Sequence, residues 1–483
     1  MVVDIIVVGG GISGMSAAYD AYKSGKSVIV LEARDRVGGR TYTIDTESGG
    51  RSDVGGAWIN EFTQPNITKL AKEAGIPIIR QSIHGTAVIE RTKNKIQTYE
   101  DHGTFELEEG MPEEDRLDEK RVVALLDELC ELVDIEEPWK CERAEEFDSI
   151  SFLGWLNSVG ASQATKNGMA SFIRCLFALE LNDVSFLYTL HYFVCGGGYE
   201  SLASNDSRGG QYQRMREGSM RVSEYIVTKL PKRSVKLSSP VQAVSQEGDI
   251  CTVVTRAGAI YTSSAIICTI PSPLYSTITW SPMLPIKKRC YGQRSYMGAC
   301  TKVVMIYDRP WWREAGYSGL GMSLVGPITQ TMDTSDGEWK SSDPTLAPRQ
   351  YSLSCFPMAN FAIEYARLPQ EERILSIKQH VARLFPSHAA EAMEPYQVLE
   401  QQWLNEEFSA GAPVPVLGCG ALTAIGEEWR TPHGRIFFAG TEMATKWKGY
   451  MDGAVSAGQQ AVADVLKVLP VKKALVNGVN GTH

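Results

Sequence analysis

The chain has 483 residues, a length that favours two domains over one, and its composition (43% hydrophobic, 22% charged) is that of an ordinary globular protein. Its net charge of −9 argues against a nucleic-acid-binding protein, which normally presents a basic face. No run of about 18 apolar residues occurs, so we expect no membrane-spanning helix or anchor.

Secretion and metal binding are also not expected. The first apolar run starts at Val2 or Val3 without a basic leader, and the last residues carry no Ser-Lys-Leu ending, so we expect a cytoplasmic protein. Ten cysteines, from Cys130 to Cys419, and seven histidines are scattered without the spacing of metal ligands. In a reducing compartment the cysteines are expected to be buried thiols.

The first elements along the chain form a predicted βαβ unit. Residues 3–8 are an apolar run typical of a strand buried on both faces of a parallel sheet. The small-residue segment 12–24 predicts a helix that stops at Gly25, and residues 27–33 predict the second strand.

The middle of the chain alternates between helical and strand patterns. Helical periodicity starts at Lys69, residues 84–120 are polar and acidic and predict hairpins and loops, and residues 122–133 predict an amphipathic helix. A second polar loop is predicted over 331–349. Further strands are predicted at 234–237, 252–258 and 265–271. The chain is therefore expected to pass back and forth between two domains.

The turn after the first strand carries a glycine pattern that suits a dinucleotide. Gly9, Gly11 and Gly14 form GxGxxG, which allows a tight turn, close approach of a diphosphate and close helix–strand packing. The helix N-terminus would present free N–H groups to that diphosphate. Glu32 ends the second strand, where a carboxylate would accept hydrogen bonds from ribose hydroxyls. A chance glycine turn is the alternative, but the whole pattern predicts a bound dinucleotide.

The next segment indicates which dinucleotide. Residues 33–43, ARDRVGGRTYT, combine a glycine pair with two arginines that could contact a diphosphate, and residues 53–60, DVGGAWIN, add a second glycine pair. An isolated RxGGR would be read as a surface turn. Because it follows a predicted dinucleotide-binding βαβ unit along the chain, the combination resembles the FAD-binding signature of glutathione-reductase-like flavoproteins, and more narrowly that of the flavin-containing amine oxidase family.

The end of the chain extends this resemblance. RIFFAGTE resembles the family's second FAD-contacting strand and turn, and WKGYMDGAVSAGQQA resembles the end of monoamine oxidases, soluble fungal ones included. The helix that begins near Met451 would aim its N-terminus at the flavin ring, where it would stabilise negative charge. Tight helix packing is the other interpretation of its small residues. The middle of the chain matches in patches, among them RMREGSMRVSEYI, VKLSSPV and GACTKVVMIYDRPWW.

The resemblance implies an α/β fold in which a glutathione-reductase-like, Rossmann-type FAD-binding domain is interwoven with an α+β substrate-binding domain. We expect the first domain at 1–80, 211–270 and 430–470, the second at 81–210 and 271–429, and a flexible tail at 471–483. The residues implied to hold FAD are Gly9, Gly11, Ile12, Ser13, Gly14, Glu32, Ala33, Arg34, Gly38, Gly39, Arg40, Gly55, Gly56, Ala57, Trp58, Val241, Gly440, Glu442, Tyr450 and Met451.

In this family a neutral amine gives a hydride equivalent to flavin N5, water hydrolyses the imine, and O₂ reoxidises the flavin to yield hydrogen peroxide. The resemblance gives Lys302 the role of holding a water near N5, although an ordinary strand-edge lysine would look the same. It makes Tyr450 one wall of an aromatic cage for the amine, the alternative being a core tyrosine. Gln211 aligns loosely with a glutamine of the substrate cavity.

The sequence departs from the family at two neighbouring positions. Ala412 stands where mammalian enzymes attach FAD through a cysteine, and Cys419 is too far along the chain to replace it, so non-covalent FAD is expected. Pro413 stands where the opposite cage aromatic would be, so the cage is incomplete unless another aromatic, such as Trp429 or Trp447, supplies that wall.

Other functions share these motifs. A desaturase or protoporphyrinogen-oxidase-like enzyme, or an oxidase of a larger secondary metabolite, has the same N-terminal signature. An L-amino-acid oxidase would need an arginine for the substrate carboxylate, and a polyamine oxidase would favour an acidic tunnel. A GDP-dissociation-inhibitor-like protein would bind partner proteins without flavin. We expect an amine and O₂ as the partners, and a homo-oligomer is left open.

Overall fold

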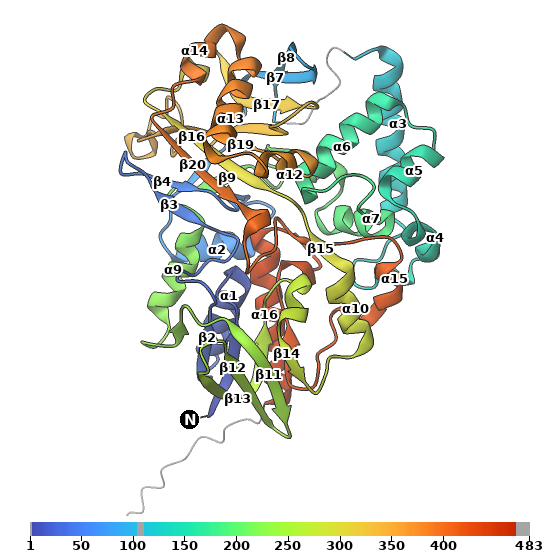
Figure 1. Ribbon diagram of the computed structural model, residues 1–483, viewed down its shortest axis with the longest axis vertical. Coiled ribbons are helices and arrows are strands. Elements are labelled where there is room, and N and C mark those ends of the chain that lie inside the picture. Colours follow the sequence, from blue (N-terminus) through green and yellow to red (C-terminus); the bar gives the residue numbers. More distant parts are fainter. Residues whose placement is uncertain (1, 104–110, 470–483) are drawn as a thin grey trace, which may run out of the picture.

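The computed structural model describes residues 2–103 and 111–469. The predicted tail at 471–483 lies outside the described residues. The molecule is long and consists of two sheet-based parts stacked along its longest axis, with a group of helices beside the upper part (Figure 1).

The first part is built on an eight-stranded sheet at the lower end of Figure 1. Its strands, in spatial order, are β10 (Val235–Lys236), β2 (Val28–Leu31), β1 (Val2–Val8), β13 (Ile260–Cys268), β12 (Ile250–Thr255), β11 (Val241–Glu247) and β14 (Thr279–Ser281), with β22 (Ile436–Phe438) also paired to β13. The centre of the sheet is parallel, as predicted from the apolar run at 3–8. Each strand predicted from the sequence lies in this sheet, with slightly different ends. β14 extends the sheet beyond residue 270, where the change of domain was expected.

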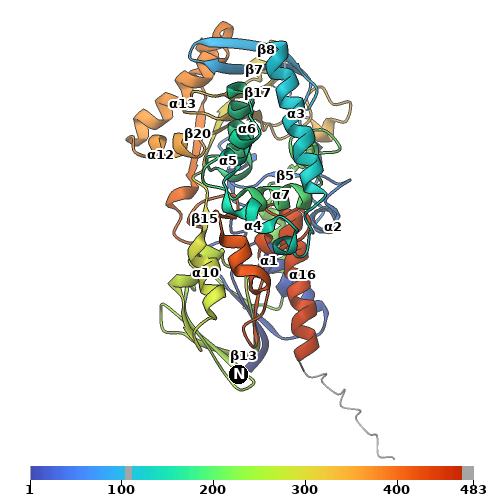
Figure 2. The same ribbon diagram turned by 90° about the vertical axis from the view of Figure 1, so that its right-hand side faces the viewer.

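Two helices from opposite ends of the chain pack together on this sheet. α1 (Ile12–Lys23) follows β1, and α16 (Met451–Val468) follows β22 (Figures 1 and 2). A Cβ atom at Gly458 of α16 would collide with the backbone oxygen of Ser13 in α1. The small residues of α16 therefore permit close helix packing, and both helix N-termini lie near the same edge of the sheet.

The second part is built on a seven-stranded sheet. Its order is β20 (Gln397–Gln402), β16 (Thr301–Tyr307), β19 (Tyr351–Phe356), β18 (Gln330–Asp333), β17 (Tyr317–Ser323), β7 (Gly85–Thr92) and β8 (Lys95–Asp101). The β7–β8 hairpin confirms one hairpin of the predicted polar segment 84–120. Most of the predicted loop 331–349 lacks longer elements, although β18 covers its first residues.

The prediction of loops through residue 120 is wrong for its last part. Helix α3 (Glu113–Cys130) starts well before the apolar periodicity at Val122 and ends earlier than expected. Its first turn carries Glu113, Glu114 and Asp115, which favour a helix N-terminus but leave no apolar stripe for a sequence reader to detect.

The remaining elements are three small sheets and the other helices. A three-stranded sheet contains β5 (Trp58–Ile59), β9 (Gln213–Met215) and β6 (Ile78–Arg80). Two antiparallel pairs are the hairpin of β3 (Thr43–Asp45) with β4 (Arg51–Asp53), and β15 (Ser295–Met297) with the sequence-distant β21 (Pro415–Leu417). The helix expected from Lys69 begins earlier, at Pro65. The other α-helices are α2 (Pro65–Glu73), α4 (Ala144–Ser149), α5 (Phe152–Ser158), α6 (Gln163–Phe177), α7 (Phe186–Cys195), α8 (Tyr199–Leu202), α9 (Met220–Lys229), α10 (Ile286–Arg294), α11 (Trp311–Glu314), α12 (Asn360–Ala366), α13 (Gln370–Leu384), α14 (Ala389–Ala392) and α15 (Ala421–Ile425).

Candidate active site

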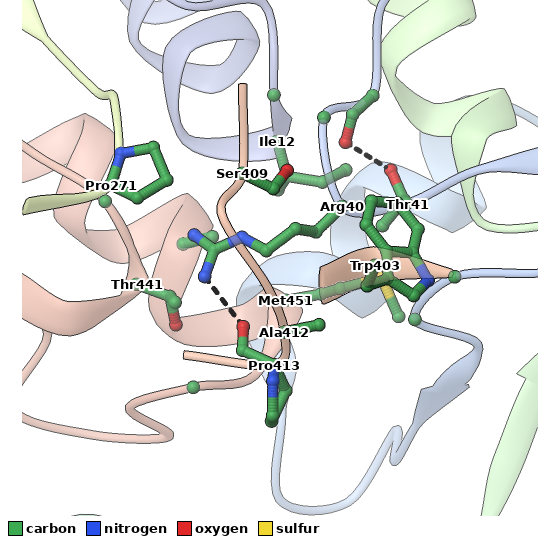
Figure 3. Close-up of a pocket in the computed structure, with 18 of the residues that line it drawn as sticks. Ile12, Arg40, Thr41, Pro271, Trp403, Ser409, Ala412, Pro413, Thr441 and Met451 are labelled. Atoms are coloured by element: carbon green, nitrogen blue, oxygen red, sulfur yellow. Dashed lines mark hydrogen bonds between the residues drawn. The ribbon is translucent and has the colours of Figure 1, made fainter. Parts of the chain in front are cut away.

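A long cavity lies between the two parts of the molecule and encloses about 2210 Å³ of space that no protein atom fills, the mouth included. Figure 3 shows a portion of its lining, to which distant chain segments contribute side by side. The residues predicted from the sequence that line it are Gly9, Gly11, Ile12, Ser13, Glu32, Ala33, Arg34, Gly38, Gly39, Arg40, Gly55, Gly56, Ala57, Trp58, Gln211, Val241, Lys302, Ala412, Pro413, Gly440, Tyr450 and Met451. Gly14 and Glu442 do not line it.

The glycines of the first turn form a shallow cradle. Gly9 has a φ of 105°, a left-handed conformation that favours glycine. A Cβ atom at Gly11 would meet no atom closer than the Cα of Gly39, 3.8 Å away, so space is left on that side. A Cβ atom at Gly14 would instead collide with the carbonyl oxygen of Gly9. Gly14 therefore serves helix–strand packing, and Gly11 leaves room for a ligand.

Glu32 lies at the end of β2 with a fixed carboxylate. Its Oε2 accepts from the backbone N–H of Gly10 at 2.5 Å, and its Oε1 accepts from the backbone N–H of Arg34 at 2.8 Å. Each carboxylate oxygen can accept a further hydrogen bond. Ribose hydroxyls, which donate hydrogen bonds, therefore suit this position.

The N-termini of α1 and α16 both border the cavity without a side-chain cap. The hydroxyl of Ser13 is buried and has no hydrogen-bond partner among the described residues. Asp452, in the first turn of α16, accepts from the backbone N–H groups of Asn66 and Ile67 at 2.6 and 2.9 Å. Its charge is thus engaged by α2, and the free N–H groups at both helix ends suit the negative parts of FAD.

Arg40 and Arg34 are held by different groups at the edge of the cradle. The Arg40 guanidinium donates to the carbonyl of Pro413 at 2.7 Å (Figure 3), and the Arg34 guanidinium pairs with Glu406 at 2.8 Å. Burial lowers the pKa of Arg40, an effect that the charge of Glu442 opposes from 3.9 Å. Glu442, predicted to lie beside the cofactor, packs against the turn at Gly440 and supports Arg40. Its contact with bound FAD stays a prediction.

Lys302 marks the other end of the cavity. Its side chain is 2% exposed, and its Nζ donates to the carbonyl of Gly55 at 3.2 Å. The ammonium lies 5.0 Å from the ring centre of Trp58 and 5.4 Å from that of Phe356. Burial lowers the pKa of Lys302 to about 8, although the charge of Asp53 opposes this shift.

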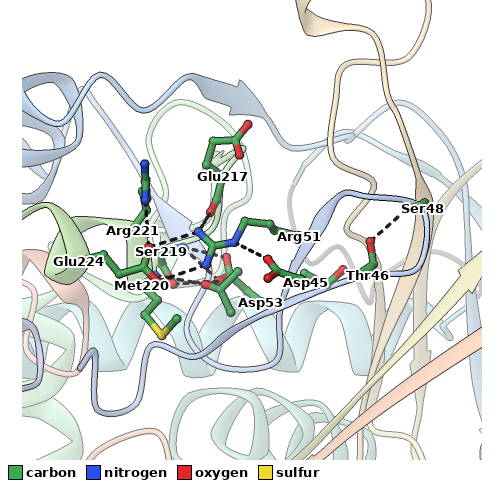
Figure 4. Close-up of polar contacts among 12 residues, drawn as sticks. Asp45, Thr46, Ser48, Arg51, Asp53, Glu217, Ser219, Met220, Arg221 and Glu224 are labelled. Carbon is green, nitrogen blue, oxygen red and sulfur yellow. Dashed lines mark hydrogen bonds and ion pairs between the residues drawn. The ribbon is translucent and has the colours of Figure 1, made fainter. Parts of the chain in front are cut away.

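The segment that carries Gly55 is fixed by a polar network around Asp53 (Figure 4). Asp53 accepts from the backbone N–H of Ser219 at 3.0 Å and from the hydroxyl of Thr43 at 2.6 Å. Burial raises the pKa of Asp53, and the charge of Lys302 opposes that rise. This network sets the position of the carbonyl that accepts from Lys302.

Tyr450 and Gln211 lie together in the lining. The Tyr450 hydroxyl accepts from Gln211 Nε2 at 3.2 Å, and burial raises the pKa of the phenol so that it stays neutral. The Trp447 ring packs edge-on against Tyr450, with centroids 5.0 Å apart. Neither Trp447 nor Trp429, the two rings considered as a replacement for the second cage wall, lines the cavity.

Several lining residues were missed by the sequence analysis. The segment directly after β13 contributes Thr269, Ile270, Pro271, Leu274, Thr277 and Ile278. Their place after a predicted parallel strand was the available signal, because ligands bind at the carboxyl ends of such strands. Helices α6 and α7 and strand β19 also contribute aromatic and thiol side chains that belong to no recognisable sequence motif. These are Phe172, Cys175, Tyr192 and Phe356.

Within residues 2–103 and 111–469, no helix combines the length and apolar character needed to cross a bilayer. In the same part of the chain, no group of His, Cys, Asp and Glu side chains is arranged to hold a metal ion.

Comparisons with known proteins agree with this geometry. Residues 12–466 match the family described as flavin containing amine oxidoreductase. The chain is 35% identical to the flavin-containing amine oxidase B of Mus musculus, over 96% of this chain and 86% of that one. It is 32% identical to a probable flavin-containing monoamine oxidase A of Dictyostelium discoideum, over 94% and 95%. The solved structure of wild-type putrescine oxidase bound to putrescine superposes with a TM-score of 0.86 at 28% identity, over 97% and 99%.

Proposed function

The chain belongs to the flavin-containing amine oxidase family, and we propose that it oxidises a monoamine in the Lys302–Tyr450 end of its cavity with non-covalently bound FAD. The fold class predicted from the sequence is the family's own, a Rossmann-type FAD-binding part with a substrate-binding part. The observation that carries the proposal is one continuous cavity, which joins the Gly11 cradle to the buried Lys302 and Tyr450.

Bound FAD would supply the redox chemistry, in which the amine carbon gives up a hydride equivalent to leave an imine, and O₂ takes up the two electrons and two protons to form hydrogen peroxide. The imine then reacts with water to give a carbonyl compound and the released amine or ammonia. The protein has to place the amine, exclude bulk water and supply charge at this site.

We assign these tasks to the side chains of Tyr450 and Lys302 and to one helix N-terminus. Tyr450, held by Gln211, offers a neutral aromatic face to the amine. Lys302 provides an N–H donor for a water molecule, and it also provides a positive charge. Because this ammonium group is buried away from bulk water, its electrostatic effect on the site is strong. The N-terminus of α16 adds a partial positive charge beside Met451.

We also propose a cytoplasmic location. All ten cysteines are free, and a reducing compartment maintains that state.

Anaerobic titration of the purified yellow protein with a panel of amines tests the proposed function. We expect primary or secondary monoamines to bleach the visible flavin absorption, and air to restore it with release of one equivalent of peroxide. Alcohols with the same carbon skeleton are the control, and they should leave the visible flavin absorption unchanged. A yellow protein that no amine bleaches would contradict amine oxidation and favour a desaturation reaction.

Unfolding the yellow protein in acid should release all of its flavin. Ala412 offers no sulfur at the position where the mammalian relatives attach FAD, and Cys419 does not line the cavity. We expect the yellow colour to pass through a filter that retains the polypeptide. Colour that stays with the chain would contradict non-covalent binding and direct attention to the lining thiols, Cys175 and Cys300.

A further inference from the structure

A second, smaller cavity borders Lys302, and we call it the polar cavity. It encloses about 330 Å³ of space that no protein atom fills, its opening included. Lys302 and Ala57 are the only described residues that line both the polar cavity and the long cavity. The Lys302 side chain therefore forms part of the wall between the two cavities.

The polar cavity is lined mainly by polar and charged side chains, and it reaches from the protein interior toward solvent. Arg214 and Asp336 on its lining are buried. The side chain of Arg51 is 19% exposed, and Arg216 is half-buried. Roomy polar cavities in proteins hold water, whereas apolar ones stay dry. We therefore expect water between these arginines and the buried Lys302.

The ammonium group of Lys302 has more donors than the protein has acceptors for it. It carries three N–H bonds. In the described part of the chain its one acceptor is the carbonyl of Gly55, at 3.2 Å. A buried N–H without an acceptor is unfavourable, so the other two require water or ligand atoms. The family resemblance assigns one of them to a water on the substrate side, which leaves one for the polar cavity.

Asp53 supplies an acceptor on the lining of the polar cavity. Its Oδ1 accepts from the hydroxyl of Thr43 at 2.6 Å and from the backbone N–H and the hydroxyl of Ser219 at 3.0 and 3.1 Å. Its Oδ2 receives only a share of the same Ser219 N–H, at 3.3 Å. A carboxylate oxygen has room for further donors, so Oδ2 can bind water that also contacts Lys302.

Lys302 is able to exchange a proton at moderate pH. Burial lowers its pKa to about 8, and the charge of Arg214 lowers it as well, whereas Asp53 and Cys300 act in the opposite direction. The other charged groups on the lining of the polar cavity are Arg51, Arg216 and Asp336. A group with a pKa near the working pH both releases and regains a proton readily.

Resting on the proposed amine oxidation, we propose that the polar cavity is a solvent route by which protons reach Lys302 while an amine fills the long cavity. Peroxide formation from O₂ takes up two electrons and two protons, and the hydride equivalent from the amine brings both electrons and one proton. The second proton comes from Lys302. One N–H bond of its ammonium group breaks, the electron pair stays on Nζ, and an O–H bond of the peroxide forms. A proton passed along the polar cavity from solvent then restores the ammonium group.

A methylene group added inside the polar cavity tests this route. Val304 lines the polar cavity and does not line the long one. It lies two residues from Lys302 on β16, so both side chains point to the same face of the strand. Val304→Ile therefore narrows the route without replacing any polar group. Val303→Ile is the matched control, because it adds the same methylene group on the opposite face of the strand, within the core.

High-resolution crystal structures of the FAD-loaded wild type and of both variants give a readout that involves no amine and no turnover. We expect ordered water in the polar cavity of the wild type and of Val303→Ile, with one molecule about 2.9 Å from Lys302 Nζ. In Val304→Ile this water should be lost. A wild-type polar cavity without water overturns the proposal, and this result stands even if Val304→Ile fails to fold.

Stopped-flow reoxidation gives the second readout. The FAD-loaded proteins are photoreduced without O₂ and mixed with O₂ in the presence or absence of 2-phenylpropan-2-amine, whose amine-bearing carbon has no hydrogen to lose. With the long cavity filled by this amine, we expect Val304→Ile to reoxidise about tenfold more slowly than the wild type and Val303→Ile. With the long cavity open, water reaches Lys302 from that side, and all three rates should agree.

The contrast between the filled and the open cavity separates proton supply from a displaced lysine. Slowing of Val304→Ile to the same extent in both conditions, or no slowing in either, overturns the proposal. Binding of the amine is followed by the flavin absorption of the oxidised protein. A protein that binds no amine contradicts the proposed function, and the crystal structures, which contain no amine, then decide on the solvent route alone.

Discussion

Replacing Gly11 by alanine is expected to weaken FAD binding by at least about 100-fold, about 2.8 kcal/mol, while the polypeptide still folds. A Cβ atom at this position has 3.8 Å of clearance from the nearest protein atom, Gly39 Cα, so the chain itself tolerates it. The methyl group would occupy the cradle that the diphosphate needs. Flavin content after purification and the Kd of added FAD are the measurements.

Gly14→Ala is the matched control, because its Cβ atom would collide with the carbonyl oxygen of Gly9 within the protein. We expect this variant to lose about 3 kcal/mol of stability in urea unfolding of the FAD-free protein, whereas Gly11→Ala changes it by less than about 1 kcal/mol. A Gly11→Ala protein that binds FAD as tightly as the wild type would contradict the cradle.

Lys302→Met is expected to lower kcat/KM for the best amine by about 10²–10³-fold without loss of bound FAD. Methionine fills the same space between Trp58 and Phe356 but brings neither the charge nor the N–H donor. Stopped-flow absorption separates flavin reduction by the amine from reoxidation by O₂. Lys288→Met is the control, since Lys288 is equally buried, donates to the carbonyl of Trp429 at 3.0 Å and does not line the cavity. Equal losses in both variants would show that Lys302 acts only through stability.

The pH dependence of activity and of stability provides an independent test of the role assigned to Lys302. Its pKa is lowered to about 8, so its positive charge, and the activity that depends on it, should decline as the pH rises through about 8 in the wild type. Unfolding restores the ordinary value of 10.5, so the unfolded chain binds more protons between these pH values and stability rises with pH across that window. In Lys302→Met we expect neither this decline of activity near pH 8 nor this rise of stability with pH. A wild-type profile that is flat near pH 8 would contradict the assigned role.

The elements that were predicted most accurately are those that local sequence patterns encode. GxGxxG with Glu32 predicted the first βαβ unit, and the small residues of 451–461 predicted a helix that α16 confirms. Gly14 packs against the first turn, as its position in the motif predicts, whereas Glu442 packs against the turn at Gly440 and lies outside the cavity lining. The directions of the Trp429 and Trp447 rings depend on packing that no local pattern specifies.

The residues of the substrate end could not have been found in this way. Gln330, Cys175 and Asn205 stand in different elements, and no spacing relates them. They meet in the cavity lining only after the chain has folded, so no local pattern could have identified them.

The pairing of α1 with α16 has a consequence for biosynthesis. The cradle precedes α1, which begins at Ile12, yet the partner helix α16 begins only at Met451. A growing chain therefore exposes a half-site during the synthesis of all the residues between them, and contacts so distant in sequence form slowly. The FAD site is complete only after α16 has been made, so FAD supply from that moment on would govern how much of the newly made protein reaches its mature form.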